Sequence, residues 1–472
     1  MGWDETHSRL IGLINANIIL SNGTGYVPPD LSHYGHNPRF YGPVVETFLV
    51  LIEKPLGLES MRDITLMRHG VTFLIFYAGV VAFYFVCKKI FRSRWPALTG
   101  AILLAFQPRL FAHAFYNSKD IPFLSLCVIA FLTLMIWTER PGMRAVLLHA
   151  LAAALVAGTR IVGLFLAGLT VLCAGRIRPR SLAVWGPCML FILFLLWPVL
   201  WANPLSAPRE IYTLVFQRTR VAWADNWNLY RGMGYLAPSV PWHYLPWWIA
   251  ITTPPAVLFL FIAGAVSFFR SADKDRRFWV GLAFLWLCLP LATVMLLHFP
   301  VLNEWRHFFF VYPALLIVAL HGLDRLGGVV RSKALLSAAL IAAHLPVAWF
   351  MVRSHPYQNV YFNRLAGPSM AVIAENYDMD YWGLSYQRAL EHILRTDADP
   401  VIPIYAVNRA GVNLNALSEE DRRRIRVVRD YRKAKYLITS ARGRVRELLT
   451  RPEVYSVEVG GAKLMSVYRA SQ

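Results

Sequence analysis

The chain of 472 residues is dominated by repeated apolar runs, most of them close to twenty residues long. Because the hydrocarbon core of a bilayer is about 30 Å thick, about ten such runs predict a bundle of transmembrane helices. The runs cover residues 66–87, 96–113, 121–138, 145–157, 161–175, 181–202, 245–269, 278–298, 308–323 and 334–352. The fourth run has only about 13 residues, too few to cross alone, so it and the fifth are expected to form a re-entrant or broken pair around Gly158-Thr159-Arg160.

The composition agrees with a membrane protein and excludes several other classes. Hydrophobic residues make up 56% of the chain and charged residues 16%, against roughly 45–50% and 25% in a soluble domain. Many of the Lys and Arg residues behind the net charge of +20 lie in short clusters between the apolar runs, so we expect no nucleic-acid partner. The five cysteines lie in or beside those runs, so no disulfide framework or cysteine-based zinc site is predicted.

The distribution of Lys and Arg predicts the orientation, because positively charged short loops stay in the cytoplasm. The richer set of loops holds Lys88, Lys89, Arg92, Arg94, Arg140, Arg144, Arg176, Arg178, Arg180, Arg270, Lys274, Arg276, Arg277, Arg325, Arg331 and Lys333. The region before residue 66 and the tail after residue 353 then lie outside. An external N-terminus normally follows a signal or a span. We therefore expect either a further transmembrane helix before Met1 in the natural gene or a short tail that crosses unaided.

Three regions follow from these patterns. Residues 1–65 form the first outer loop with surface helices, residues 66–353 form the transmembrane bundle, and residues 354–472 form a small extracytoplasmic α/β domain. In the last region, strand-like runs occur at Val401–Val407, Tyr436–Thr439, Val454–Val459 and Leu464–Tyr468, and helical stretches occur at 384–395, 418–424 and 441–450.

The first outer loop opens with Asp4, Glu5 and His7, followed by an apolar pattern typical of an amphipathic helix on the membrane surface. The two carboxylates would lie at its N-terminus, where the helix dipole favours anions. They are therefore either simple helix caps or site residues. A later stretch of the loop, with Tyr34 and Arg39, is punctuated by Gly and Pro, so it is either an ordinary surface loop or an ordered polar loop of a site.

The second outer loop carries Arg109, Lys119 and Asp120. Asp120 begins the third apolar run, so it is either a capping residue or a member of a site, and Lys119 places a cation beside it.

Further charges stand at the outer ends of later runs. Arg160 lies between two apolar segments, where a charge costs about 2.5–3.5 kcal/mol unless it meets a cavity, a carboxylate or a phosphate, or snorkels to the surface. Glu304, Arg306 and His307 open another run. The loop 203–244 interleaves Trp and Arg, which suits either an interfacial aromatic belt or sugar stacking and phosphate pairing.

Separated carboxylates and isolated cations on one side of a membrane point to chemistry on a lipid phosphate. Cations suit a phosphate leaving group, and a carboxylate suits the deprotonation of an incoming hydroxyl. A transporter or flippase of a lipid-linked sugar is the main alternative, but it would distribute polar residues over both faces. A structural scaffold would leave Arg160 and the acidic loops unexplained.

The order of these motifs resembles the C-type glycosyltransferase superfamily, which uses polyprenyl-phosphate sugars. The resemblance is to protein O-mannosyltransferases and to the bacterial lipid A aminoarabinose transferase group. It rests on Asp4-Glu5-x-His7 with the later His and Pro residues of the loop, the segment from Gln107 to Pro122, Gly158-Thr-Arg160, Glu304-Trp-Arg306-His307 through Pro313, and the block 355–385. It covers roughly residues 1–385.

The resemblance implies an α-helical polytopic membrane protein with eleven to thirteen helices and two surface helices in the first loop. The shortfall in apolar runs again favours a helix before Met1. It also implies an inverting transfer of one sugar from a polyprenyl phosphate to a lipid, glycan or protein hydroxyl. Asp4 would be the base, Glu5 the fallback, and Asp120 would orient the acceptor or support the base.

The resemblance assigns the substrate to cationic, polar and aromatic residues of the outer face. The expected substrate-binding residues are His7, Tyr34, Arg39, Arg109, Lys119, Arg160, Glu304, Arg306, His307 and Trp382. The aromatic residues of the block 355–385 would equally suit the bilayer surface. No cofactor and no metal site is required, although a divalent cation is compatible with the carboxylates. The expected location is a bacterial inner membrane in contact with its lipids, with the site facing the periplasm.

Overall fold

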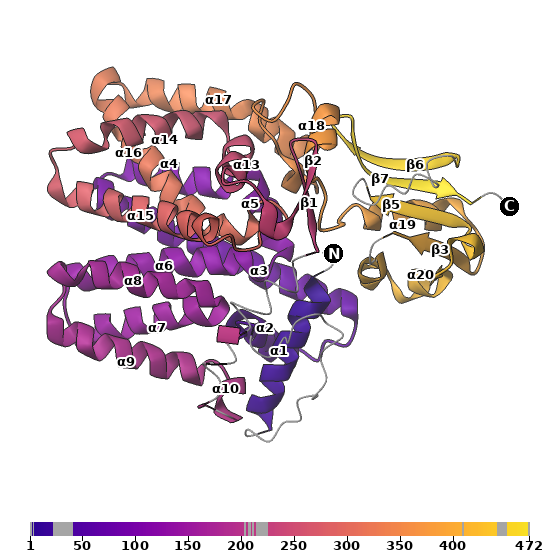
Figure 1. Cartoon of the computed structure of the whole chain (residues 1–472), viewed down its shortest axis with the longest axis horizontal. Helices are drawn as coiled ribbons and strands as arrows, with labels where there is room; N and C mark the ends of the chain where they lie inside the picture. The colour runs from indigo at the N-terminus through magenta and orange to yellow at the C-terminus, as the bar shows by residue number, and fades with distance from the viewer. Residues whose placement is uncertain are drawn as a thin grey trace.

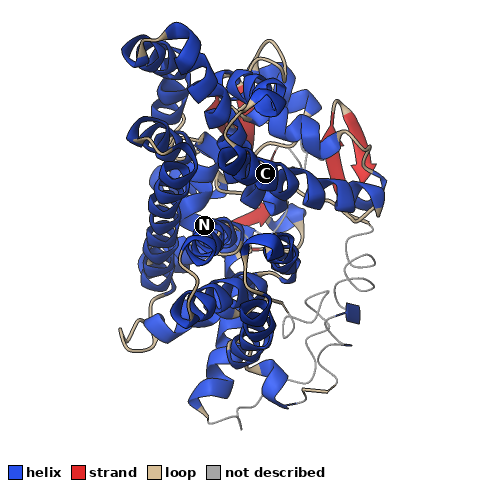
Figure 2. Ribbon diagram, turned by 90° about the vertical axis from the view of Figure 1, so that its left-hand side faces the viewer, coloured by secondary structure: helices blue, strands red, loops and turns tan. Residues whose placement is uncertain are grey.

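The computed structural model describes residues 2, 4–21, 41–202, 204, 205, 209, 212, 213, 225–407, 410–440 and 451–470. Helices make up most of the described molecule, and its named strands are confined to a hairpin and one small sheet (Figure 2). The long helices run side by side along the longest axis (Figure 1). They are α3 (Met61–Phe91), α4 (Arg94–Ala105), α6 (Asp120–Glu139), α7 (Met143–Thr159), α8 (Phe165–Leu172), α9 (Pro179–Leu195), α14 (Pro255–Ser267), α15 (Lys274–Leu296), α16 (Tyr312–Val330) and α17 (Lys333–Arg353).

Among the described residues, five helical segments are long and apolar enough to cross a membrane. They are Met61–Phe91, Asp120–Glu139, Lys274–Leu296, Arg306–Val330 and Lys333–Arg353. Shorter apolar helices cover Met143–Thr159, Ile161–Leu172, Pro179–Leu195 and Pro255–Arg270. The chain is therefore an integral membrane protein, as its hydropathy predicts.

Besides the run 181–202, which divides at Pro198 into α9 and α10 (Val199–Ala202), two of the predicted continuous runs are broken in the structure, and both of these breaks precede a proline. The run 96–113 divides into α4 and α5 (Pro108–Tyr116), because Gln107 caps α5 by accepting a hydrogen bond from the backbone N–H of Leu110 at 2.7 Å. The run 245–269 divides into α13 (Tyr244–Thr252) and α14, with Thr253 extended before Pro254. A residue before proline avoids the helical conformation, which explains the second break.

The expected break near Arg160 is also present. α7 ends at Thr159, Arg160 is extended, and a 3-10 turn (Ile161–Leu164) leads into α8. The Arg160 side chain is thus carried on a turn between two helices rather than within one.

The segment before α3, predicted to be the first outer loop, contains two helices, α1 (Glu5–Leu20) and α2 (Val44–Glu53), which pack against each other. α1 runs across the direction of the long helices at one end of the bundle (Figure 1). Such an orientation is that expected of a helix on the membrane surface. The residues between α1 and α2 from 22 to 40 lie outside the described part of the chain.

The same end of the bundle carries the C-terminal sheet (Figure 1). Its strand order is β4-β3-β5-β7-β6, with β3 parallel to β4 and β5, and β7 antiparallel to β5 and β6. The strands are β3 (Ile402–Ala406), β4 (Ile425–Val427), β5 (Tyr436–Ser440), β6 (Glu453–Val459) and β7 (Ala462–Arg469), with helices α18 (Met370–Asn376), α19 (Tyr386–Thr396) and α20 (Glu419–Arg424). The short edge strand β4 and the hairpin β1 (Trp227–Tyr230) and β2 (Met233–Leu236) were not predicted from the sequence.

The core of the bundle depends on close helix contacts at small residues, as is common where lipid supplies no hydrophobic drive between helices. α14 and α16 meet at Gly264 and Gly322. A Cβ added at Gly264 would lie 1.9 Å from the Val318 carbonyl oxygen, and one at Gly322 would lie 2.2 Å from the Leu260 carbonyl oxygen. The two backbones can approach this closely only because neither position has a side chain.

Gly322→Ala should therefore lower stability, because the new methyl group forces two backbones apart at a cost of about 1–3 kcal/mol. Gly186→Ala is the matched control, since a Cβ there meets nothing within 4 Å and alanine favours the helix. The thermal unfolding midpoint, measured in detergent at one scan rate, should be lower than that of wild type for Gly322→Ala. For Gly186→Ala it should be equal to that of wild type or higher. Equal midpoints would contradict this account of the helix contact.

Candidate functional site

Four charged side chains from four separate segments meet at the end of the bundle that carries α1. Asp4 precedes α1, Asp120 begins α6, Arg160 lies at the turn after α7, and Arg306 begins the 3-10 turn that leads into α16. Arg306 Nη1 lies 3.3 Å from Asp4 Oδ2 and 3.7 Å from Asp120 Oδ2, and Arg160 Nη2 lies 2.9 Å from Asp120 Oδ1. The four residues form an alternating row of charges, Arg160–Asp120–Arg306–Asp4, which we name the charge row.

Asp120 is the buried member of the charge row, with 2% of its residue surface exposed. Its position as the first residue of α6 favours the carboxylate through the helix dipole. Asn117 fixes it from both sides: its side-chain amide donates to Asp120 Oδ2 at 2.8 Å, and its carbonyl oxygen accepts from the Asp120 backbone N–H at 2.9 Å. Asp120 therefore has its oxygens committed to protein partners, including two guanidinium groups.

Asp4 is the accessible member, with 36% of its side chain exposed. Burial raises the pKa of its carboxyl, but the positive charges of Arg306, Lys119 and His7 together lower that pKa by more, so it lies below its ordinary value. The carboxylate is thus ionised at neutral pH and can accept a proton. Its backbone carbonyl accepts hydrogen bonds from the backbone N–H and the hydroxyl of Ser8, both at 2.9 Å, which fixes the residue at the start of α1.

Aromatic side chains from the segment after the last span cover Arg306. Its guanidinium carbon lies 4.9 Å from the ring centroid of Trp382 and 6.0 Å from that of Tyr381. The backbone at Gly2 packs directly on the Trp382 ring, since a Cβ there would lie 2.3 Å from it. Cation–π contacts of this kind strengthen when the groups are desolvated. Trp382, a predicted substrate-binding residue, therefore lines the charge row.

A polar chain links this aromatic segment to Asp120. The Tyr381 hydroxyl lies 3.2 Å from His113 Nε2, and His113 Nδ1 lies 3.0 Å from the Asn117 side-chain amide. His113 and Asn117 are almost fully buried. Sequence reasoning missed His113 and Asn117 as site members, although Asn117 is only three positions from Asp120.

Three further predicted residues lie around the charge row. Lys119 sits over the ring of Tyr41, 5.0 Å from its centroid. His7 interacts electrostatically with Asp4, and His307 interacts with Arg306, Arg160 and Lys119. Lys119, His7 and His307 thus lie within the electrostatic range of the same site.

Glu5 has a different environment from Asp4. One of its oxygens pairs with His69 Nε2 of α3 at 2.8 Å, and the other accepts the backbone N–H of Gly2 at 2.6 Å. Burial raises the pKa of the Glu5 carboxyl, but several interactions, led by those with His69, together lower it by more. The side chain is 5% exposed and turned to α3, so the structure does not bring it into the charge row.

Arg109 and Glu304, both predicted to bind substrate, form an ion pair with each other in the interior, with neither side chain exposed. Arg109 also donates to the Tyr361 carbonyl oxygen at 3.1 Å and lies 4.6 Å from the ring centroid of Phe362. The pair joins α5 to the segments on either side of α16 and α17, so its contacts are structural ones. Tyr34 and Arg39, the other two predictions, lie outside the described residues.

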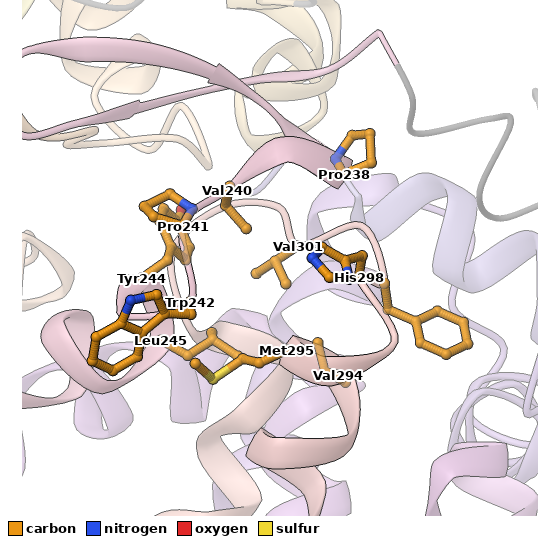
Figure 3. Close-up of a pocket in the computed structure, with 11 residues that line it drawn as sticks. Pro238, Val240, Pro241, Trp242, Tyr244, Leu245, Val294, Met295, His298 and Val301 are labelled. Carbon is orange, nitrogen blue, oxygen red and sulfur yellow. The ribbon is translucent and has the colours of Figure 1, made fainter.

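A surface hollow elsewhere on the molecule has a different character. It is apolar, and Figure 3 shows Trp242, Leu245, Val294, Met295 and His298 among the residues that line it. None of the predicted site residues lines this hollow. Within the described ranges, no group of three or more His, Cys, Asp or Glu side chains could hold a metal ion. Between Asp4 and Asp120 the space is taken by the Arg306 guanidinium.

The comparisons with known proteins place the fold. No family model matches the chain, and no curated protein matches it. Solved structures do match: ArnT from Cupriavidus metallidurans in the apo state has a TM-score of 0.51 at 15% identity, covering 98% of this chain and 93% of that one. The structure of the same protein bound to undecaprenyl phosphate also gives 0.51 at 15% identity, covering 98% of this chain and 94% of that one.

The Archaeoglobus fulgidus oligosaccharyltransferase in its apo form matches with a TM-score of 0.52 at 10% identity. The match covers 92% of this chain, which spans 61% of the length of that one. At such identities the likeness shows the fold. The chain has the C-type glycosyltransferase fold that its motifs resemble, with a small C-terminal sheet in addition to the helices.

Arg306→Gln should raise the pKa of Asp4, because Arg306 is the strongest of the groups that lower it. The carboxyl is then protonated over a range that extends to higher pH. A water-soluble carbodiimide reacts with protonated carboxyls, so the pH of half-maximal labelling of Asp4, followed by peptide mass spectrometry, should move upward. Arg9→Gln removes a cation of α1 that pairs with Glu53 rather than with Asp4. This variant should leave the pH of half-maximal labelling unchanged. Identical labelling curves for wild type and Arg306→Gln would contradict the electrostatic assignment.

Proposed function

We propose that this chain is an inverting glycosyltransferase that moves one sugar from a polyprenyl phosphate to an acceptor hydroxyl. The observation that carries the proposal is the charge row at one end of a membrane bundle: an accessible, ionised Asp4 paired with the Arg306 guanidinium, and a second guanidinium, that of Arg160, paired with Asp120. A carboxylate that takes a proton and cations that receive a phosphate are the two requirements of this reaction.

In the proposed reaction, the acceptor O–H gives its proton to the Asp4 carboxylate as its oxygen attacks the anomeric carbon. The new C–O bond forms on the face opposite to the phosphate, which inverts the configuration. The bond between the anomeric carbon and the phosphate oxygen breaks, and its electron pair leaves with the phosphate. Because that leaving group is stable as an anion, Arg160, Arg306 and Lys119 need only stabilise its negative charge, and no general acid is required. The transition state has oxocarbenium character.

The two acidic residues take different roles in this proposal. Asp4 is the general base because it is accessible and has one guanidinium partner. Asp120 is buried between two guanidinium groups, so we assign it to orienting Arg160 and Arg306 and to supporting the acceptor. Trp382 and Tyr381 would complete the wall of the site and shield Arg306 from water.

The donor class is supported by proteins that share the fold. One matching structure is ArnT bound to undecaprenyl phosphate, and another, with a TM-score of 0.50, is the archaeal oligosaccharyltransferase AglB in complex with an inhibitory peptide and a dolichol-phosphate. We infer a polyprenyl-phosphate sugar as donor and a lipid, glycan or protein hydroxyl as acceptor. The excess of Lys and Arg at the opposite end of the bundle supports an external site, in a bacterial inner membrane facing the periplasm.

Transport of a lipid-linked sugar is the alternative reaction class. A transporter holds its substrate near the midplane, between repeated halves. The charge row lies instead at the end of the bundle that also carries α1 and the C-terminal sheet (Figure 1), which favours transfer at the surface.

Asp4→Asn should abolish transfer, because the amide cannot accept the acceptor proton, while donor binding and the unfolding midpoint remain close to wild type. The measurement is a transfer assay with radiolabelled polyprenyl-phosphate sugars and a membrane extract as the acceptor source. The mass of the labelled product identifies the acceptor. A variant that retains near-normal activity would remove Asp4 from the role of base.

Arg160→Ala should mainly weaken donor binding, because a charge-assisted contact with the phosphate is lost. We expect an affinity about tenfold lower or weaker still, as is usual for hydrogen bonds to charged groups. Binding of a short-chain polyprenyl phosphate to the purified protein provides the measurement, with Arg160→Lys as the matched variant that keeps the charge. If all three proteins bind the lipid equally, Arg160 only balances the charge of Asp120.

A further inference from the structure

We propose that Arg68 and His69, adjacent residues of α3, are positioning residues that hold the two acidic residues of the charge row in register. The inference rests on the proposed function, because it assigns to this pair the alignment of the base Asp4 with Asp120. Neither residue touches the charge row directly. Each acts through a buried glutamate of the first outer loop.

His69 acts on the segment that carries Asp4. Its Nε2 pairs with Glu5 at 2.8 Å, and the other oxygen of Glu5 accepts the backbone N–H of Gly2 at 2.6 Å. Asp4 lies between these two anchored residues, so its backbone is fixed on both sides. The 64 residues between His69 and Glu5 make this a tertiary constraint that α1 cannot supply by itself.

Arg68 acts on the segment that carries Asp120. It forms an ion pair with Glu46 of α2, and both side chains are at most 5% exposed. The other oxygen of Glu46 accepts a hydrogen bond from the Ser118 hydroxyl at 2.6 Å. Ser118 lies two residues before Asp120 and directly after Asn117, so Glu46 fixes the turn from which α6 begins.

The arrangement follows from helix geometry. Consecutive residues of an α-helix point about 100° apart, so Arg68 can face α2 while His69 faces α1. α3 is a firm base for both, because it packs closely on α6, where a Cβ at Gly79 would lie 2.6 Å from the Ser125 side chain. The segments that carry Asp4 and Asp120 are thereby both anchored to one rigid helix, α3.

The energetics of a buried ion pair indicate what such a pair contributes to the protein. Burying a glutamate and an arginine costs desolvation that their attraction offsets only in part, so a buried pair adds little net stability. Fixing geometry is the better-attested use of such pairs, and a displacement of about 1 Å near a reacting centre can lower a rate about a hundredfold. The expected signature of the positioning role is therefore a loss of kcat in a variant that remains folded.

The test compares His69→Ala, His69→Gln and Ser118→Ala with wild type in the transfer assay. Gln at position 69 can still donate a hydrogen bond to Glu5, whereas Ala cannot. We expect His69→Ala to lower kcat about tenfold or more with little change in the donor KM, His69→Gln to restore most of it, and Ser118→Ala to lower kcat several-fold. Arg9→Gln is the matched control, because it removes an ion pair of α1 with α2 that leads to neither acidic residue, and its kcat should stay near wild type.

Two further readouts make the outcomes decisive. Unfolding midpoints of His69→Ala and Ser118→Ala close to wild type separate misalignment from misfolding. Hydrogen–deuterium exchange of the amides in residues 5–11 should be faster in His69→Ala and unchanged in His69→Gln. Because this exchange does not depend on activity, it tests the positioning role even if the wild-type protein transfers no sugar. Absence of transfer by the wild type would refute the proposed function instead. Unchanged exchange in His69→Ala, a KM effect without a kcat effect, or equal losses in the Ala and Gln variants would overturn the positioning role.

Discussion

The pairing of buried charges with opposite ones is the constraint on which the α1 end of the bundle depends. A charged group at the edge of a bilayer cannot stay isolated, since its desolvation costs several kcal/mol. The charge row meets this requirement by alternation: Asp120 lies between Arg160 and Arg306, and Arg306 lies between Asp120 and Asp4. Removing either inner member, Asp120 or Arg306, takes from Arg160 or Asp4 the ion-pair partner that it has in the row.

These pairings also determine how distant segments are assembled. Asp4 and Arg306 are 302 residues apart in the chain, and Arg109 and Glu304 are 195 apart. Each contact joins an outer loop to the start of a different helix. The segments that precede α1, α6 and the turn at Arg306 are therefore held by side-chain charges rather than by a hydrophobic core of their own. Precise loop geometry without a local core is what a site built at the mouth of a helix bundle needs.

Much of this could be predicted from the sequence, but the partners could not. Hydropathy predicts the bundle, and the one-sided distribution of Asp, Arg and His predicts its functional end. Gln107-Pro108 marks a helix break that a closer reading of proline would have found. Residue type alone does not distinguish Arg306 from Arg109. Arg306 pairs with Asp4, whereas Arg109 pairs with Glu304. The choice depends on which helices face each other. His69 and Arg68 carried a signal, because a charged pair within the first turns of an apolar helix needs partners.

The two aspartates of the charge row show why a site can use one residue type for two purposes. Their intrinsic chemistry is the same, so their roles must come from their surroundings. Asp120 is 2% exposed and has both oxygens engaged, which suits it to hold cations in place. Asp4 has a side chain that is 36% exposed and a single guanidinium partner at 3.3 Å, so an incoming hydroxyl can reach it. Because Arg306 contacts both, a phosphate that attracted this guanidinium would also weaken its hold on Asp4. In the proposed reaction, leaving-group binding and base strength would thus be coupled through one side chain.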